Sequence, residues 1–223
     1  MLKNSINSKM RIKSRGGVDK MSDKRKDDES KKREPVVKEQ TENYAYDGDD
    51  LDFFGMEEER YEIIEGVRYD MQAAPTIHHQ QISGALHIML HQTCHPNGTI
   101  LYSPVDVYLD EDNQFQPDLV YILHENAAII KEKRIEGVPD LAVEILSPST
   151  SHNDKVRKKR QFERFGLKEY WIVDPVHLTL DQFILNGDGK LNLVETYVAP
   201  NRVTSPLFSC IDIDMKRVFA GLH

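Results

Sequence analysis

The spacing of apolar residues after Tyr61 predicts a series of short strands interrupted by two helices. The segment YEIIEGVRYDM alternates apolar and polar positions around Glu65-Gly66, a pattern typical of a β-hairpin. Pro75-Thr76 then opens a helix over roughly residues 78–95. Its apolar residues fall on one face, at Ile82, Leu86, Met89 and Leu90. This helix should therefore pack against a sheet.

The following segments predict that sheet. Residues 99–110 and 116–123 read as two strands joined by a turn at Asp112-Asn113. The segment DLAVEILS is almost continuously apolar, as expected of a central strand covered on both faces. A charged amphipathic helix over residues 153–165 ends at Gly166, and the segment EYWIVDP is a fourth core strand.

The last segments, LTLDQFIL and KLNLVETYV, predict a trailing β-hairpin. The core order is then αβββαβ, which indicates an α/β or α+β domain with a mixed sheet flanked by helices. Residues 1–45 are rich in charge and poor in apolar side chains, so we expect a disordered tail ahead of one domain over residues 46–223.

Charge and cysteine content narrow the class of protein. The formal net charge is −8 and the acidic excess lies after residue 50, so any nucleic-acid site must rest on a local basic patch. Cys94 and Cys210 lack the spacing of a zinc site or a disulfide scaffold, and we expect two reduced thiols. With no apolar signal segment and no membrane-spanning stretch, the expected location is the cytoplasm.

Two acids stand at positions where a strand should be buried. Asp118 follows Pro117 at the start of the second core strand, and Glu144 lies inside the most apolar strand. A buried carboxylate is costly unless it is paired, protonated or bound to a metal ion. On a helical wheel, Lys158 shares the apolar stripe of Phe162 and Phe165, which should face the sheet. A lysine there either extends past the aromatic rings to water or meets a buried acid, and the two acids are natural partners.

The segments QPDLV, DLAVEILSPST and EYWIVDP, with a basic helix between the last two, resemble the Uma-two family of endonucleases in the PD-(D/E)XK superfamily. The resemblance runs from about Tyr61 to Pro200 and implies a restriction-endonuclease-like fold. It implies that Asp118 and Glu144 bind Mg²⁺ or Mn²⁺ and that the chain hydrolyses phosphodiester bonds, with DNA as the expected partner. Ile145-Leu146 follow Glu144, so the lysine of the superfamily pattern is missing there, and Lys158 takes its role.

Further residues are assigned to the same site at lower rank. Asp106 and Glu62 could complete an acidic pocket, although either acid could equally be solvated or salt-bridged. His79 matches a position that the resembled family often fills with histidine, and its role stays open. The basic helix offers phosphate contacts, or else an ordinary solvated face, through Lys155, Arg157, Lys159 and Arg160. Cleavage of both strands of a duplex would need two sites, so a homodimer is plausible.

Other interpretations stay open on the sequence alone. His87, His91 and His95 recur at helical spacing and could chelate a transition metal, but a polar helix face is the better interpretation. The same fold could also serve as a catalytically inactive module that binds nucleic acid or protein. A third possibility is a structural protein whose buried acids merely pair with Lys or Arg.

Overall fold

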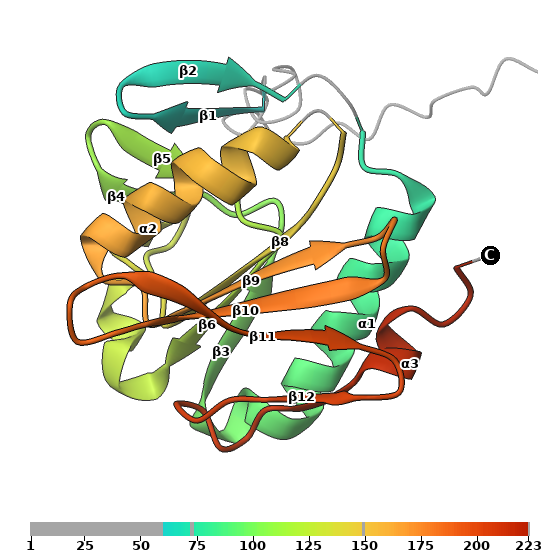
Figure 1. Cartoon of the computed structure of the whole chain (residues 1–223). Helices are drawn as coiled ribbons and strands as arrows, with labels where there is room; N and C mark the ends of the chain where they lie inside the picture. Colours follow the sequence, from blue (N-terminus) through green and yellow to red (C-terminus); the bar gives the residue numbers. More distant parts are fainter. Residues whose placement is uncertain (1–59, 72–73, 149, 223) are drawn as a thin grey trace, which may run out of the picture. The chain divides into compact units, whose positions relative to one another are not determined.

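A six-stranded mixed sheet forms the core of the part of the chain that the computed structural model describes, residues 60–71, 74–148 and 150–222. Its strand order is β11-β10-β9-β8-β6-β3 (Figure 1). β8 and β9 run parallel, and the other neighbours are antiparallel. The strands are β3 (Gly98–Tyr102), β6 (Leu119–Leu123), β8 (Leu141–Ile145), β9 (Glu169–Asp174), β10 (Thr179–Leu185) and β11 (Leu191–Val198). The expected tail over residues 1–45 lies outside the described residues.

A second, five-stranded sheet has the order β2-β1-β5-β4-β7. The leading hairpin is confirmed as β1 and β2, with Glu65 and Gly66 at positive φ in the turn. A short 3-10 helix, His124–Ile129, precedes β7. The strands are β1 (Tyr61–Ile64), β2 (Val67–Asp70), β4 (Val107–Asp110), β5 (Asn113–Phe115) and β7 (Ile135–Glu136).

The prediction of two long strands over residues 99–110 and 116–123 is wrong in one respect. The first segment divides into β3 and β4, which belong to different sheets, and β5 forms in the connection ahead of β6. Each crossing between sheets contains a proline, Pro104 or Pro117, which lacks the N–H that a sheet ladder needs. The second crossing leaves Asp118 immediately before β6, at the end of the main sheet.

Two helices cover opposite faces of the main sheet. Helix α1 (Ile77–Cys94) buries the predicted apolar stripe, and the side chain of Thr76 caps its first turn by accepting from the His79 N–H. On the other face, the predicted basic helix begins as a π-helical turn, Asn153–Lys158, and continues as α2 (Lys159–Phe165). Gly166 ends it in a left-handed conformation, as predicted. Among the described residues, no helix is long and apolar enough to cross a membrane.

These faces decide where the side chains of β8 point. Val143 and Ile145 belong to the apolar cluster beneath α1, whereas Ala142 belongs to the cluster beneath α2. Side chains alternate along a strand, so Glu144 faces α2. The order α1, β3, β6, β8, α2, β9 is the αβββαβ core expected from the sequence.

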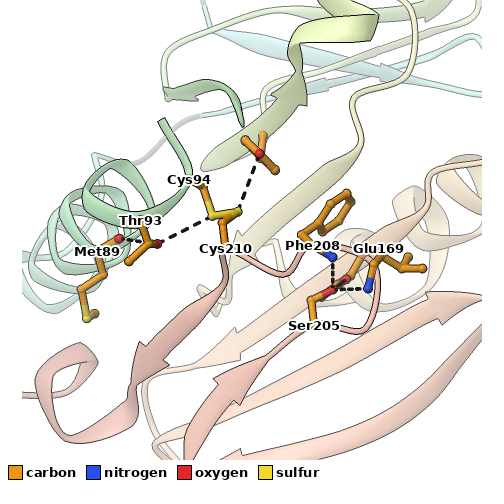
Figure 2. Close-up of a disulfide and its surroundings, with 9 residues drawn as sticks. Met89, Thr93, Cys94, Glu169, Ser205, Phe208 and Cys210 are labelled. Carbon is orange, nitrogen blue, oxygen red and sulfur yellow. Dashed lines mark hydrogen bonds between the residues drawn. A yellow bond between two sulfur atoms is a disulfide. The ribbon is translucent and has the colours of Figure 1, made fainter. Parts of the chain in front are cut away.

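The C-terminal part was not predicted beyond its hairpin. After β10 and β11, a ribbon of β12 (Arg202–Thr204) and β13 (Asp212–Asp214) and the short helix α3 (Met215–Val218) pack against α1. Cys94, before a 3-10 turn at His95–Asn97, forms a disulfide with Cys210 (Figure 2). The expectation of two reduced thiols is therefore wrong, because the fold brings together cysteines that are 116 residues apart. Disulfides are typical of oxidising compartments, so this pair gives no support to a cytoplasmic location.

Candidate active site

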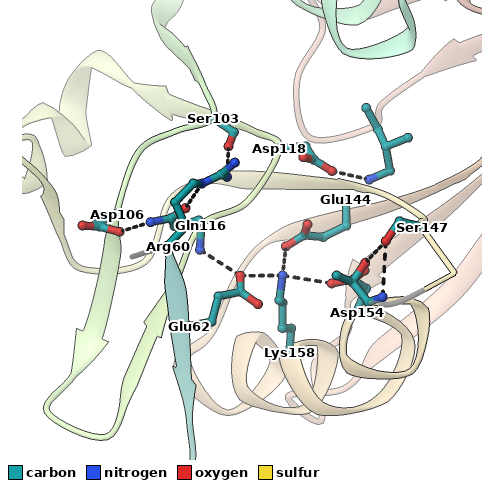
Figure 3. A network of polar contacts seen from close by, with 12 residues as sticks. Arg60, Glu62, Ser103, Asp106, Gln116, Asp118, Glu144, Ser147, Asp154 and Lys158 are labelled. Carbon is teal, nitrogen blue, oxygen red and sulfur yellow. Dashed lines mark hydrogen bonds and ion pairs between the residues drawn. The ribbon is translucent and has the colours of Figure 1, made fainter. Parts of the chain in front are cut away.

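The ammonium group of Lys158 lies among three carboxylates beneath the basic helix (Figure 3). Its Nζ is 2.7 Å from Glu62 Oε1, 3.0 Å from Glu144 Oε1 and 2.9 Å from Asp154 Oδ1. All four side chains are 4% exposed or less. Of the three contacts, the one to Glu144 also has the alignment of a hydrogen bond. The predicted approach of Lys158 to a buried strand acid is present.

The helix wheel explains how Lys158 reaches this position. Phe162, one turn further along, is fully buried and meets Phe115 edge-to-face at a centroid distance of 5.2 Å. Phe165 is only half buried, so the apolar stripe is narrower than expected. Lys158 packs its aliphatic stem along the same buried face and places its charge at Glu144.

Two further acids, one on β1 and one on the helix of Lys158 itself, contact the lysine from its remaining sides. Glu62 lies on the inner face of β1, where its Oε1 also accepts from the Gln116 N–H at 2.9 Å. Asp154 was missed by the sequence analysis, although it precedes Lys158 by four residues on the same helix. That spacing places two side chains on one helix face, so the signal was available.

Asp118 lies directly across from Glu144. The β6–β8 register pairs Leu119 with Val143, and the next step toward the end of the sheet pairs the two acids. Asp118 Oδ2 accepts from the Ile145 N–H at 2.7 Å and lies 3.0 Å from His79 Nε2. Because an ionised carboxylate can only accept, we place the proton of the imidazole on Nε2. His79 thus joins the site by orienting Asp118.

Asp106 stands apart from the lysine cluster. It lies in the connection between β3 and β4 rather than on a strand, and its Oδ1 accepts from the side chain of Gln116 at 2.9 Å. The backbone N–H of the same glutamine binds Glu62. The structure therefore links Asp106 to the acidic pocket through one intervening residue.

Burial, and the excess of negative over positive charge in the cluster, raise the pKa of Glu144 and of Asp154. Burial raises the pKa of Glu144 well above its ordinary value, and the charges of Asp154, Asp118 and Glu62 add to the effect against the opposing charge of Lys158. Burial likewise raises the pKa of Asp154. Burial alone would lower the pKa of Lys158, but the three acids together outweigh it and raise that pKa well above normal. The lysine is therefore charged, and the acids bind protons or cations readily.

Asp118 and Glu144 are suited to a divalent cation. Asp118 uses its Oδ2 and Glu144 its Oε1 in the contacts described above. Within the described residues, the second oxygen of each, Asp118 Oδ1 and Glu144 Oε2, accepts no hydrogen bond. Mg²⁺ typically takes one or two protein carboxylates and completes its shell with water and substrate oxygens. In the part of the chain described, no three His, Cys, Asp or Glu residues are grouped as a metal site. The chain thus offers two carboxylates, and water or a phosphate must supply the other ligands.

The other sequence candidates have mostly found partners within the chain. Arg157 donates to Asn153, Lys159 donates to the Leu191 carbonyl, and Arg160 pairs with Glu65, while Lys155 is exposed without such a contact among the described residues.

The histidines in the second half of α1 and just after its end stack on one another instead of converging on one point. The His91 and His95 rings are parallel at 4.4 Å, and those of His87 and His91 are 5.9 Å apart.

The sequence of the chain matches the Uma2 family, described as "Putative restriction endonuclease", over residues 50–216. The chain belongs to the Uma2 family. The match extends beyond both ends of the segment that carried the resemblance and spans most of the chain. No curated protein sequence matches it.

Solved structures agree with the Uma2 assignment. A crystal structure described as a putative nuclease belonging to DUF820, from Anabaena variabilis ATCC 29413, superposes with a TM-score of 0.61 at 20% identity. The match covers 74% of this chain and 93% of the other, and it establishes a shared fold. The type IIG restriction endonuclease BpuSI matches with a TM-score of 0.36 at 11% identity, over 68% of this chain and 17% of that one, too weakly to support an argument. The chain therefore shares its family with proteins described as putative restriction endonucleases and its fold with a protein described as a putative nuclease.

Proposed function

We propose that this Uma2 protein is a metal-dependent endonuclease that hydrolyses phosphodiester bonds in DNA. The observation that carries the proposal is the meeting of Asp118, Glu144 and Lys158 at one end of the main sheet. Burying these charged groups costs stability that apolar residues in the same strands would not. A catalytic role accounts for that cost, since such sites concentrate acids with raised pKa values.

Each residue then has a role set by its contacts. Asp118 and Glu144 would hold Mg²⁺ or Mn²⁺, and such an ion, when bound, polarises a phosphate and acidifies a coordinated water. His79 and the Ile145 N–H fix the orientation of Asp118. Lys158 stays charged at Glu144 and offsets negative charge that develops on the phosphate in the transition state. Glu62 and Asp154 position Lys158 through their contacts with its ammonium group.

One observation favours a second candidate, a catalytically inactive module that binds nucleic acid. Lys158 already has three carboxylate partners, so the cluster is held together by the chain's own charges. Structural ion-pair networks also perturb the pKa values of their members, so shifted pKa values do not by themselves indicate catalysis. The two candidates differ in whether DNA is cut.

The test is incubation of the full chain with supercoiled plasmid and with a labelled single strand, in Mg²⁺, in Mn²⁺ and in EDTA. We expect cleavage that needs a divalent ion and stops in EDTA. A folded protein that binds these DNAs and cuts none of them with either metal would favour the inactive module. Linear plasmid formed in one encounter, without a nicked intermediate, would support the proposed homodimer.

A further inference from the structure

A cavity of about 670 Å³ lies on the outer face of the five-stranded sheet, adjacent to the candidate active site. Its wall includes Tyr61 from β1, Gln114 from β5 and Tyr108 from β4. The register pairs Tyr108 with Gln114, and Gln114 with Ile63 of β1. Residues paired across strands share a face, and Tyr61 shares that of Ile63, so these side chains form a row across three strands.

Gln114 has a polar group that the fold leaves unused. Its neighbour Phe115 points into the apolar cluster beneath α2, so Gln114 points the other way. The side chain is only 5% exposed, yet its amide makes no hydrogen bond to any described residue. Gln114 lines the cavity, so its amide is available to a ligand bound there. A ligand in the cavity would supply the missing partner.

The remaining wall combines positive charge with aromatic rings. Arg60, Arg68 and Lys133 line the cavity, against the single carboxylate of Asp106. The guanidinium of Arg68 lies 4.2 Å from the centre of the Tyr61 ring. Aromatic rings and guanidinium planes stack on nucleobases, amides bond to base edges, and cations bind phosphate. The excess of cations is notable in a domain whose net charge is negative.

Hydrogen bonds connect this cavity to the candidate active site (Figure 3). Gln116 binds Arg60 and Asp106 through its side chain, and its backbone N–H binds Glu62. Arg60 also donates to the Ser103 hydroxyl, and the Ser103 N–H donates to the Asp118 carbonyl. The rim of the cavity is therefore connected to the segments that carry Glu62 and Asp118.

We propose that this cavity binds an unpaired nucleotide of the strand that is cut, so the substrate is single-stranded or locally unpaired DNA. This inference rests on the proposed nuclease function and names its substrate class. The base would stack on the tyrosines and bond to Gln114, while Arg60 and Lys133 would contact phosphate. A base inside a duplex is stacked and paired, and it cannot enter such a pocket without leaving the helix.

The test is fluorescence anisotropy with a labelled dT₁₂ strand and a blunt duplex of equal length, in EDTA so that no cleavage occurs. We expect tighter binding of the single strand. Tyr108→Ala should weaken it by roughly tenfold or more, the scale of one lost base stack. Tyr108→Phe should retain affinity, and Gln114→Leu should lose about three- to tenfold, the scale of one hydrogen bond. Tyr102→Ala, a change at an exposed tyrosine outside the cavity wall, serves as the aromatic control.

Equal affinity for the two DNAs, with Gln114→Leu at wild-type affinity, would overturn the proposal. This holds even if Tyr108→Ala does not fold, since Gln114→Leu keeps the side-chain volume. The readout is independent of catalysis. Cleavage of duplex DNA unaffected by Gln114→Leu would refute the pocket and leave the nuclease standing. Single-strand binding that needs Tyr108 and Gln114, in a protein that cuts nothing, would support the pocket and refute the nuclease.

Discussion

Lys158 Nζ lies 3.0 Å from Glu144 Oε1, so a lysine of the basic helix pairs with an acid of the central strand β8. Leu146, two residues after Glu144, is partly buried in the apolar cluster beneath α2. The superfamily pattern has a lysine at the position of Leu146. In this chain Lys158, on the following helix, supplies that positive charge instead. Lys158 also offsets part of the negative charge of the three acids around it. Both the stability of the fold and the proposed catalysis therefore depend on this one side chain.

Replacing Lys158 should destabilise the fold. Lys158→Met keeps the apolar stem but leaves Glu62, Glu144 and Asp154 buried without a cation, so we expect a loss of about 3–5 kcal/mol in the free energy of unfolding at neutral pH. Lys155→Met is the matched control, because Lys155 is exposed on the same helix, and it should change stability by under about 0.5 kcal/mol. Urea denaturation measures both. Equal, small effects would mean that the acids are not ionised in the fold.

Stability should fall as pH rises above 4.5, the ordinary pKa of a glutamate, until the raised pKa of Glu144 is passed. The folded-state pKa of Glu144 is raised above its ordinary value of 4.5 by burial, so in this range the folded chain binds more protons than the unfolded chain. Unfolding then releases protons, and its free energy decreases as pH rises. Lowered carboxyl pKa values, as at Asp212, act below this window and do not mask the effect.

Burial also raises the pKa of Glu169, which contributes with the same sign, so a variant must isolate Glu144. Glu144→Gln should flatten the pH dependence of the unfolding free energy, while Glu195→Gln on the exposed face of β11 should leave it unchanged. Denaturation of the three proteins at several pH values measures this. An unchanged slope in Glu144→Gln would assign the proton to other groups.

Reduction of the Cys94–Cys210 disulfide should destabilise the protein. The bond closes a long loop between α1 and the C-terminal ribbon, and breaking such a link typically costs about 2–5 kcal/mol. Denaturation with and without dithiothreitol gives the difference, and Cys94→Ser with Cys210→Ser should match the reduced protein. Two titratable thiols in the unreduced native protein would contradict this pairing.

The core could be predicted because its signals are local. The continuous apolar run of β8, the stripe of α1 and the turn at Gly166 each determine an element without reference to the rest of the chain. The break between β3 and β4 at Pro104 could also have been predicted, since proline interrupts the hydrogen-bond ladder of a sheet. By contrast, the disulfide and the C-terminal ribbon depend on contacts between distant segments, which periodicity does not encode.

The candidate site divides in the same way. Asp118, Glu144 and Lys158 stand out because each is a charge in an apolar pattern. Glu62 could be named only as a second-rank acid, since its burial depends on β1 pairing with β5. The partnership of His79 with Asp118 joins two elements that neither spacing nor composition relates. The sequence likewise could not show that the Gln114 amide lacks a partner among the described residues, because this depends on which face of the folded sheet the side chain occupies.

The most direct test of the nuclease site is single-turnover cleavage of DNA at saturating protein in Mg²⁺, which isolates the chemical step. We expect Asp118→Asn and Glu144→Gln to abolish cleavage, and Lys158→Met to slow it by roughly 10²-fold or more, with each variant checked for folding. Lys159→Met and Glu195→Gln should cut at nearly the wild-type rate, because neither side chain contacts the acids. Cleavage that persists in Asp118→Asn and Glu144→Gln, or equal losses in Lys158→Met and Lys159→Met, would contradict the assignment of this site.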